Sequence, residues 1–365
     1  MSTRQKSRLV CLAILMAGAL LVLSAASTSS GQAPGQKGAK PIELRWSIAW
    51  PPTDVFSTRV IPWATSEIEK RTNGRVKFTL YYSGQILGMV EVYQGIVKRI
   101  ADIGTSRMAF TPGRFPVGRG YEMPGIIFNN AQVTSSVAWE LYKKYKPPEF
   151  NDTHMLWIDS TGPGMLYTKT RVTKLEDIKN MEIRSDGLVL EAIKALGAVP
   201  VSMPMSEIYL ALDKGIVKGT LDRLGGLKDW RHAEVTKYIL MAPFIYASAV
   251  FFNAMNLDAW NSLPPDIQKV FNEVGEEMPA KSGQFAEEHE MVGLKFGLEK
   301  RMEVNYLTPQ ETARWMTLIK PVQNKWVAEV EAKGFPGKQM LEDQYKLAEQ
   351  YNKKYPHVRG KELPK

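Results

Sequence analysis

The sequence contains a single cysteine, Cys11, which lies in an apolar stretch near the N-terminus. The rest of the chain therefore has no thiol for a disulfide, for nucleophilic catalysis or for a zinc site. Its four histidines have no metal-ligand spacing, and none accompanies a serine or cysteine nucleophile motif. We therefore expect neither a metal nor another cofactor, and we expect that the protein is not an enzyme.

Signatures for binding nucleotides and nucleic acids are also missing. The sequence has no G-x-x-x-x-G-K-[ST] run and no G-x-G-x-x-G run. Its formal net charge is +9, but no block of five or more Lys or Arg residues occurs. Nucleic acid is therefore not an expected partner.

The N-terminus has the features of a secretory signal peptide. Three basic residues precede an apolar run at 9–23, and small residues follow at 24–26. The run is shorter than the roughly twenty residues of a membrane-spanning helix. We expect 1–26 to be a cleaved signal peptide and 27–41 a flexible spacer, with a lipoprotein or an uncleaved anchor as alternatives.

A short α/β pattern occupies residues 175–231. It alternates helix, strand, helix, strand, helix and strand, which predicts a small sheet with covered faces. Arg184 ends the first strand, and ligands of open α/β sheets bind outside the carboxyl ends of strands. A guanidinium there can hold a carboxylate through two parallel hydrogen bonds. The alternative is a surface arginine paired with Glu182 or Asp186.

The same stretch resembles a known family. The runs LEDIKNMEIRS and ALGAVPVSMPMSEIYLALDKGIVKG are similar to the solute-binding proteins of TRAP (tripartite ATP-independent periplasmic) transporters, DctP type. Residues 82–88 and 250–264 resemble two further family segments, YSGQILG and VFFN through WNSLP. Together these segments cover roughly 42–330 in the family order.

The resemblance implies an α/β fold of the two-lobed periplasmic binding protein type (type II-like), with crossing strands and a long helix spanning both lobes. The predicted boundaries are 42–162 plus 254–285 for lobe I, 163–253 plus 286–333 for lobe II and the spanning helices, and 334–365 for a C-terminal helical tail.

The resemblance also implies substrate-binding residues, which are Arg184, Asn253, Asp222, Trp50, Tyr82 and Gln85. Each has a plainer alternative: core packing for the aromatic residues, a capped turn for Asn253 and a surface ion pair for Asp222. Many family members carry an arginine where this chain has Gly164 and Met165. The departure favours a monocarboxylate with an apolar or aromatic body over a dicarboxylate or sugar acid.

The implied function is capture of a small organic acid in the periplasm by hinge closure and its delivery to TRAP membrane permease subunits. We expect a monomer whose partners are a small-molecule carboxylate and that permease. A ligand-sensing protein that acts on a receptor is an alternative, and a periplasmic enzyme on the same scaffold is another. The sequence leaves open which acid is bound and whether a cation binds with it.

Overall fold

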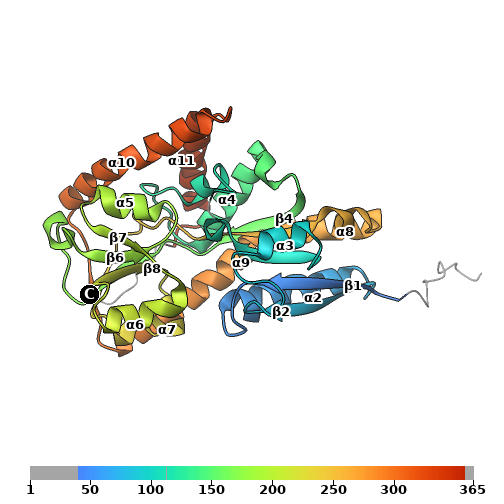
Figure 1. Cartoon of the computed structure of the whole chain (residues 1–365), viewed down its shortest axis with the longest axis horizontal. Coiled ribbons are helices and arrows are strands. Elements are labelled where there is room, and N and C mark those ends of the chain that lie inside the picture. The colour runs from blue at the N-terminus through green and yellow to red at the C-terminus, as the bar shows by residue number, and fades with distance from the viewer. Residues whose placement is uncertain (1–39, 112, 358–365) are drawn as a thin grey trace, which may run out of the picture. The chain divides into compact units, whose positions relative to one another are not determined.

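A computed structural model describes residues 40–111 and 113–357, which form two β-sheets flanked by helices (Figure 1). The predicted signal peptide lies outside these residues. The first sheet has five strands, in the order β2 (Val76–Tyr82), β1 (Ile42–Ile48), β3 (Ile103–Arg107), β10 (Val250–Asn256) and β4 (Thr153–Ser160). The second has six strands, in the order β11 (Glu303–Asn305), β9 (Tyr238–Leu240), β5 (Met165–Thr168), β8 (Gly219–Asp222), β6 (Glu182–Ser185) and β7 (Val199–Ser202).

Helices cover both sheets. The α-helices are α2 (Ile61–Arg71), α3 (Val92–Val97), α4 (Ala131–Tyr145), α5 (Val189–Ala195), α6 (Ile208–Asp213), α7 (Gly226–Asp229), α8 (Leu257–Asn261), α9 (Pro265–Glu299), α10 (Pro309–Glu331) and α11 (Gly337–Lys354). A π-helical turn at Phe56–Val60 precedes α2, and 3₁₀ turns lie at Met108–Phe110, Gly118–Glu122, Pro148–Phe150, Leu175–Ile178, Met205–Glu207 and His232–Glu234. Side chains cap the starts of α4 and α10: Asn130 accepts from two backbone N–H groups of α4, and Thr308 accepts from one of α10.

The strand directions bring several carboxyl ends together. In the first sheet β1 is parallel to both β2 and β3, and in the second sheet β6 is parallel to both β7 and β8. This confirms the predicted βα units. The third strand was predicted at Ile216 but begins at Gly219, because the N–H groups of Ile216 and Val217 bond to the carbonyl of Ala211 and complete the end of α6.

Helix α9 joins the two parts of the fold (Figure 1). Its 35 residues run through Pro279 and give a length of about 50 Å at 1.5 Å per residue. Two glycines allow close packing, since a Cβ on Gly275 would lie 2.3 Å from the Leu156 carbonyl of β4. A Cβ on Gly293 would lie 2.1 Å from the Leu224 carbonyl, just after β8. The predicted helix spanning both lobes is therefore confirmed.

Two neighbouring segments connect the sheets. The first follows β4 and the second precedes β10, and they bond to each other where Thr161 N donates to Ala249 O at 3.0 Å and Gly164 N donates to Tyr246 O at 2.9 Å. Strand β10 then pairs with β3 and β4 along its length. Its residues 250–253 thus belong to the first sheet, whereas the sequence prediction placed them in the second lobe. The two-lobed α/β architecture agrees with the expected fold class.

A search of the described helices for a membrane-spanning candidate finds none that is both long and apolar enough.

Candidate functional site

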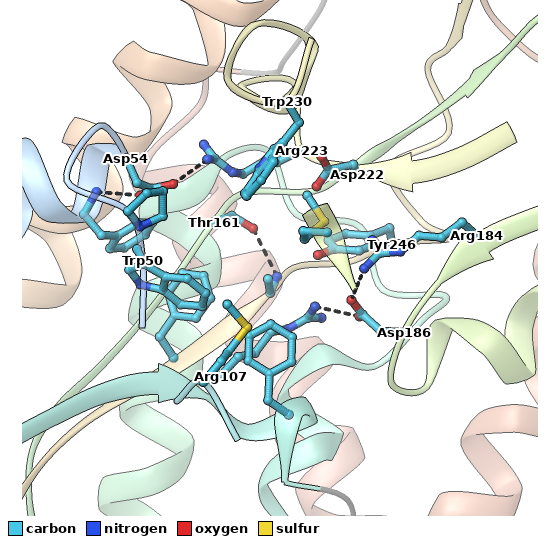
Figure 2. A pocket seen from close by; sticks show the side chains of 17 residues that line it. Trp50, Asp54, Arg107, Thr161, Arg184, Asp186, Asp222, Arg223, Trp230 and Tyr246 are labelled. Carbon is cyan, nitrogen blue, oxygen red and sulfur yellow. Dashed lines mark hydrogen bonds and ion pairs between the residues drawn. The ribbon is translucent and has the colours of Figure 1, made fainter. Parts of the chain in front are cut away.

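A pocket lies between the two sheets, next to the connecting segments (Figure 2). Its empty volume is about 630 Å³ with the open mouth included. The carboxyl ends of β1, β3, β6 and β8 all contribute to it, as expected for α/β sheets. The lining residues are Trp50, Pro51, Asp54, Phe56, Met89, Arg107, Phe110, Thr161, Arg184, Asp186, Met205, Asp222, Arg223, Trp230, Tyr246, Ala249 and Phe251.

Arg184 is held firmly at the end of β6. It is buried, with 2% of its surface exposed, and its Nε and Nη2 donate to the Met203 carbonyl at 3.2 and 3.0 Å. Nη2 also lies 3.4 Å from an Asp186 oxygen. Nη1 donates no hydrogen bond to any described residue. The predicted arginine is therefore buried and paired with Asp186, and one of its nitrogens is unbonded among the described residues.

Arg107 is a second guanidinium in the pocket, which the sequence analysis missed. As the last residue of β3, it donates to both Glu122 oxygens at 3.0 and 2.9 Å. Its Nη1 lies 2.6 Å from Asp186 Oδ1, so Asp186 bridges Arg107 and Arg184 (Figure 2). Burial opposes the charge, but Asp186 and Glu122 hold the pKa of Arg107 well above its ordinary value. Arg107 is therefore charged, and protein carboxylates already occupy it.

Arg223 forms a second ion pair between the two parts of the fold, this time with the arginine from the part built on the second sheet and the aspartate from the part built on the first. It follows β8, and its Nη2 donates to Asp54 Oδ2 of the β1 loop and to Asp229 Oδ2, both at 2.8 Å. Asp54 is fixed in turn, because its Oδ1 accepts from Phe56 N at 2.9 Å. On the far side, Asp229 is hydrogen-bonded to His289 of α9. Each part of the fold thus sends one arginine to an aspartate of the other part.

Asp222 also lines the pocket, but none of the described arginines forms an ion pair with it as they do with Asp54 and Asp186. It is 4% exposed, and its Oδ2 makes no hydrogen bond with the described residues. His232 Nδ1 lies 3.5 Å away, and neither ring nitrogen of His232 forms a hydrogen bond with a described residue. Burial raises the pKa of Asp222 to about 7, against the charges of Arg223 and Arg184. Burial, followed by those same arginines, lowers the pKa of His232 to about 3, so the imidazole is neutral.

Aromatic side chains form the remaining wall. The ring of Trp50 lies 4.8 Å from that of Phe251 and 5.9 Å from that of Phe110, measured between centroids. Phe56 meets Phe251 edge-on at 4.7 Å. Trp50 therefore packs in the core and also faces the pocket, which combines the two alternatives that the sequence left open.

The other three predicted site residues lie outside the pocket lining. Asn253 is buried in the first sheet, where its Nδ2 donates to Asp159 at 3.2 Å and its Oδ1 accepts from Thr105 at 2.7 Å. Gln85 accepts a hydrogen bond from the backbone N–H of Tyr82 at 2.9 Å, just after β2. The structure thus brings Arg184, Asp222 and Trp50 together. Ligand roles for all six residues stay predictions.

The arrangement of the site suits binding. No group of three or more His, Cys, Asp or Glu residues in the described part of the chain could hold a metal ion. One side of the pocket offers a fixed guanidinium nitrogen and the other an aromatic surface. Such a site can orient an anion that has an apolar body.

Comparisons with known proteins agree with this geometry. The family model for bacterial extracellular solute-binding protein family 7 (DctP) matches residues 47–329. A TRAP periplasmic solute-binding protein from Desulfovibrio salexigens, crystallised as an open complex, is 32% identical with a TM-score of 0.79, over 88% of this chain and 98% of that one.

For two further relatives, the acid or class of acid that each binds is known. A TRAP solute-binding protein from Rhodoferax ferrireducens, solved with copurified benzoate, has a TM-score of 0.79 at 24% identity, over 86% of this chain and 99% of that one, which establishes a common fold. The C4-dicarboxylate-binding periplasmic protein DctP of Rhodobacter capsulatus is 25% identical over 272 residues, which are 72% of this chain and 80% of that one.

Proposed function

We propose that this chain, which belongs to the bacterial extracellular solute-binding protein family 7, captures a small organic acid in the periplasm and delivers it to the membrane permease of a TRAP transporter. The observation that carries the proposal is Arg184, a buried guanidinium that lines the pocket with Nη1 unbonded among the described residues.

The ligand carboxylate binds Arg184 when the two lobes close. In the open protein the carboxylate approaches Nη1 from solvent. Hinge closure at the paired connecting segments then brings the aromatic wall over the ligand and expels water. The loss of water strengthens the charge-assisted hydrogen bond. The closed protein is the form that the permease recognises.

The pocket favours an acid with one carboxylate and an aromatic or apolar body. Of the three guanidiniums that line it, Arg107 and Arg223 are each ion-paired with protein carboxylates. Nη1 of Arg223 makes no hydrogen bond with the described residues but lies 3.6 Å from Glu290. A second ligand carboxylate would therefore have to compete with protein carboxylates for these two arginines, which is unfavourable. The aromatic wall around Trp50 supplies the apolar surface. The benzoate of the Rhodoferax ferrireducens protein is an acid of this class.

A thermal-shift screen of the protein exported to the periplasm of an expression host tests the proposal. The screen uses mono- and dicarboxylic acids after the protein has been unfolded, extracted and refolded to remove bound solute. A ligand at about one hundred times its Kd adds about 2.7 kcal/mol of stability. We expect aromatic monocarboxylates such as benzoate to stabilise the protein more than succinate does. If no acid stabilises the refolded protein and the extract contains none, the proposal is wrong.

A further inference from the structure

Carboxyl groups outnumber guanidiniums around the pocket, which affects the kind of ligand that the pocket can bind. Three guanidiniums face six carboxylates when the lining residues and their direct ion-pair partners are taken together. The carboxylates are Asp54, Asp186, Asp222, Glu122, Asp229 and Glu290. An acid that brought only another negative charge would enter an acid-rich site. A ligand that also carried a hydrogen-bond donor would find an acceptor there.

Oδ2 of Asp222 is an acceptor that the described residues leave unused. The other two aspartates of the lining, Asp54 and Asp186, are ion-paired with arginines at 2.8 Å or less. By contrast, Oδ2 of Asp222 is buried and makes no hydrogen bond with the described residues. An unsatisfied buried polar group is costly, and native structures normally supply a partner, including a bound ligand or water.

The surroundings hold this carboxylate in place. A Cβ on Gly226 would lie 2.0 Å from Asp222 Oδ2, so the absence of a side chain at Gly226 makes room for the oxygen. His232 stands behind it at 3.5 Å, which is too far for a hydrogen bond. Figure 2 shows Asp222 on the same side of the pocket as Arg184. A ligand whose carboxylate meets Arg184 can therefore extend a substituent toward Asp222.

We propose that Asp222 accepts a hydrogen bond from a hydroxyl, amino or ring N–H group of the ligand, so that the preferred solute is an acid carrying such a donor. The inference rests on the proposed function and adds the second recognition group to it. Arg184 fixes the carboxylate, and Asp222 selects among acids of similar size.

Matched pairs of acids test the inference by isothermal titration calorimetry. Benzoate is compared with 3-hydroxybenzoate and 3-aminobenzoate, and phenylacetate is compared with mandelate and phenylglycine. For at least one pair, the wild-type protein should bind the donor-bearing acid ten times or more tighter than its parent. Asp222→Leu removes the acceptor at similar volume, and we expect it to reduce that preference to threefold or less while the parent acid still binds.

Two further variants serve as an intermediate case and as a control. Asp222→Asn keeps an acceptor oxygen without the charge, and we expect it to give an intermediate preference. Asp213→Asn removes an exposed carboxylate on α6 and should leave the preference unchanged. If Asp222→Leu does not fold, a fall of at least threefold in the preference of Asp222→Asn takes its place.

The outcomes separate this inference from the proposed function. If wild-type protein binds parent acids as tightly as donor-bearing ones in every pair, Asp222 does not select a donor and the inference is overturned, whatever the variants do. A preference that survives in Asp222→Leu also overturns it. If none of these acids binds and the broader screen is also silent, the proposed function fails and the inference fails with it.

Discussion

The two sides of the pocket differ in chemistry. The part of the fold built on the first sheet contributes most of the apolar surface, through Trp50, Phe56, Met89, Phe110 and Phe251. The part built on the second sheet contributes Arg184, Asp186, Asp222 and Arg223. A ligand with one charged end and one apolar end is therefore oriented by the site before any detailed fit is considered.

The exceptions to this division have a structural role. Arg107 and Asp54 belong to the apolar side, yet each is ion-paired across the pocket, to Asp186 and Arg223 respectively. These two pairs connect the sides in opposite directions. In the proposed function, these ion pairs hold the two sides of the pocket together, and Arg184 and Asp222 bind the ligand.

Removing the anchor on the polar side should have the largest effect. Arg184→Ala leaves the ligand carboxylate buried without a partner, which should weaken binding of the acid found in the screen by roughly 2–5 kcal/mol. Arg184→Lys should retain part of the affinity, because a lysine supplies charge without the planar fork. Calorimetry measures both variants. Arg171→Ala, at an exposed arginine on the same side, is the control, and binding by Arg184→Ala within tenfold of wild type would exclude Arg184 as the anchor.

The second prediction concerns stability and pH. The pKa of Asp222 is about 7 in the folded protein and 3.8 ordinarily, so the folded state binds this proton more tightly. Wild-type protein should therefore lose stability as pH rises from about 4 to above 7, and Asp222→Asn should be spared that loss. At 1.36 kcal/mol per pKa unit, the variant gains at most about 4 kcal/mol relative to wild type at pH 8.

Urea unfolding of both proteins at pH 4 and pH 8 measures most of this difference. Asp159, whose pKa burial also raises to about 7, and His232 are present in both proteins, so their contributions largely cancel. Asp213→Asn should follow wild type at both values. Parallel pH profiles for wild type and Asp222→Asn would show that Asp222 ionises as freely when folded as when unfolded.

The third prediction removes part of the apolar side. Phe110 is half-buried and touches the edge of the Trp50 ring. Phe110→Ala should weaken benzoate binding by about 1–2 kcal/mol, because the ring loses buried apolar contact, and should affect propionate less. Leu210→Ala, at an exposed leucine, is the control. An equal loss for both acids would mean that the ligand ring does not lie on this wall.

The smallest effect is expected for an ion pair between the sides. Asp54→Asn keeps the hydrogen bond that Oδ1 accepts from Phe56 N, but Arg223 then donates to an uncharged amide in place of a carboxylate. This change should make the free energies of lobe closure and of ligand binding each about 1 kcal/mol less favourable. Small-angle scattering without ligand should show a larger radius of gyration than for wild type, and calorimetry should show the weaker binding. Asp258→Asn, at an exposed aspartate, should change neither. An unchanged radius and affinity for Asp54→Asn would remove this pair from closure.

The sequence predicts the part of the site that follows from local pattern. Arg184 was found because a short strand ends on it, and the same strand-end rule would have found Arg107. From sequence alone, a short buried strand is expected over 100–104, ending at Gly104, whereas β3 continues through this glycine to Arg107. A glycine normally favours a turn, but Gly104 instead allows α3 to pack closely on the strand, since a Cβ there would lie 2.7 Å from Val92.

The ion pairs across the pocket could not be predicted from local pattern. Arg223 and Asp54 lie 169 residues apart, and only the folded arrangement brings them together. The fold was more accessible, since caps and turn residues mark the helices. The helix predicted at 132–145 is Ala131–Tyr145, and its start is fixed by the Asn130 side chain.

A crystal structure of the protein with bound benzoate tests the central claim most directly. We expect the carboxylate within hydrogen-bond distance of Arg184 Nη1 and the ring against Trp50 and Phe110, with the lobes closed around it. A benzoate carboxylate that lies away from Arg184, or a ring that packs on the charged side, would contradict the account.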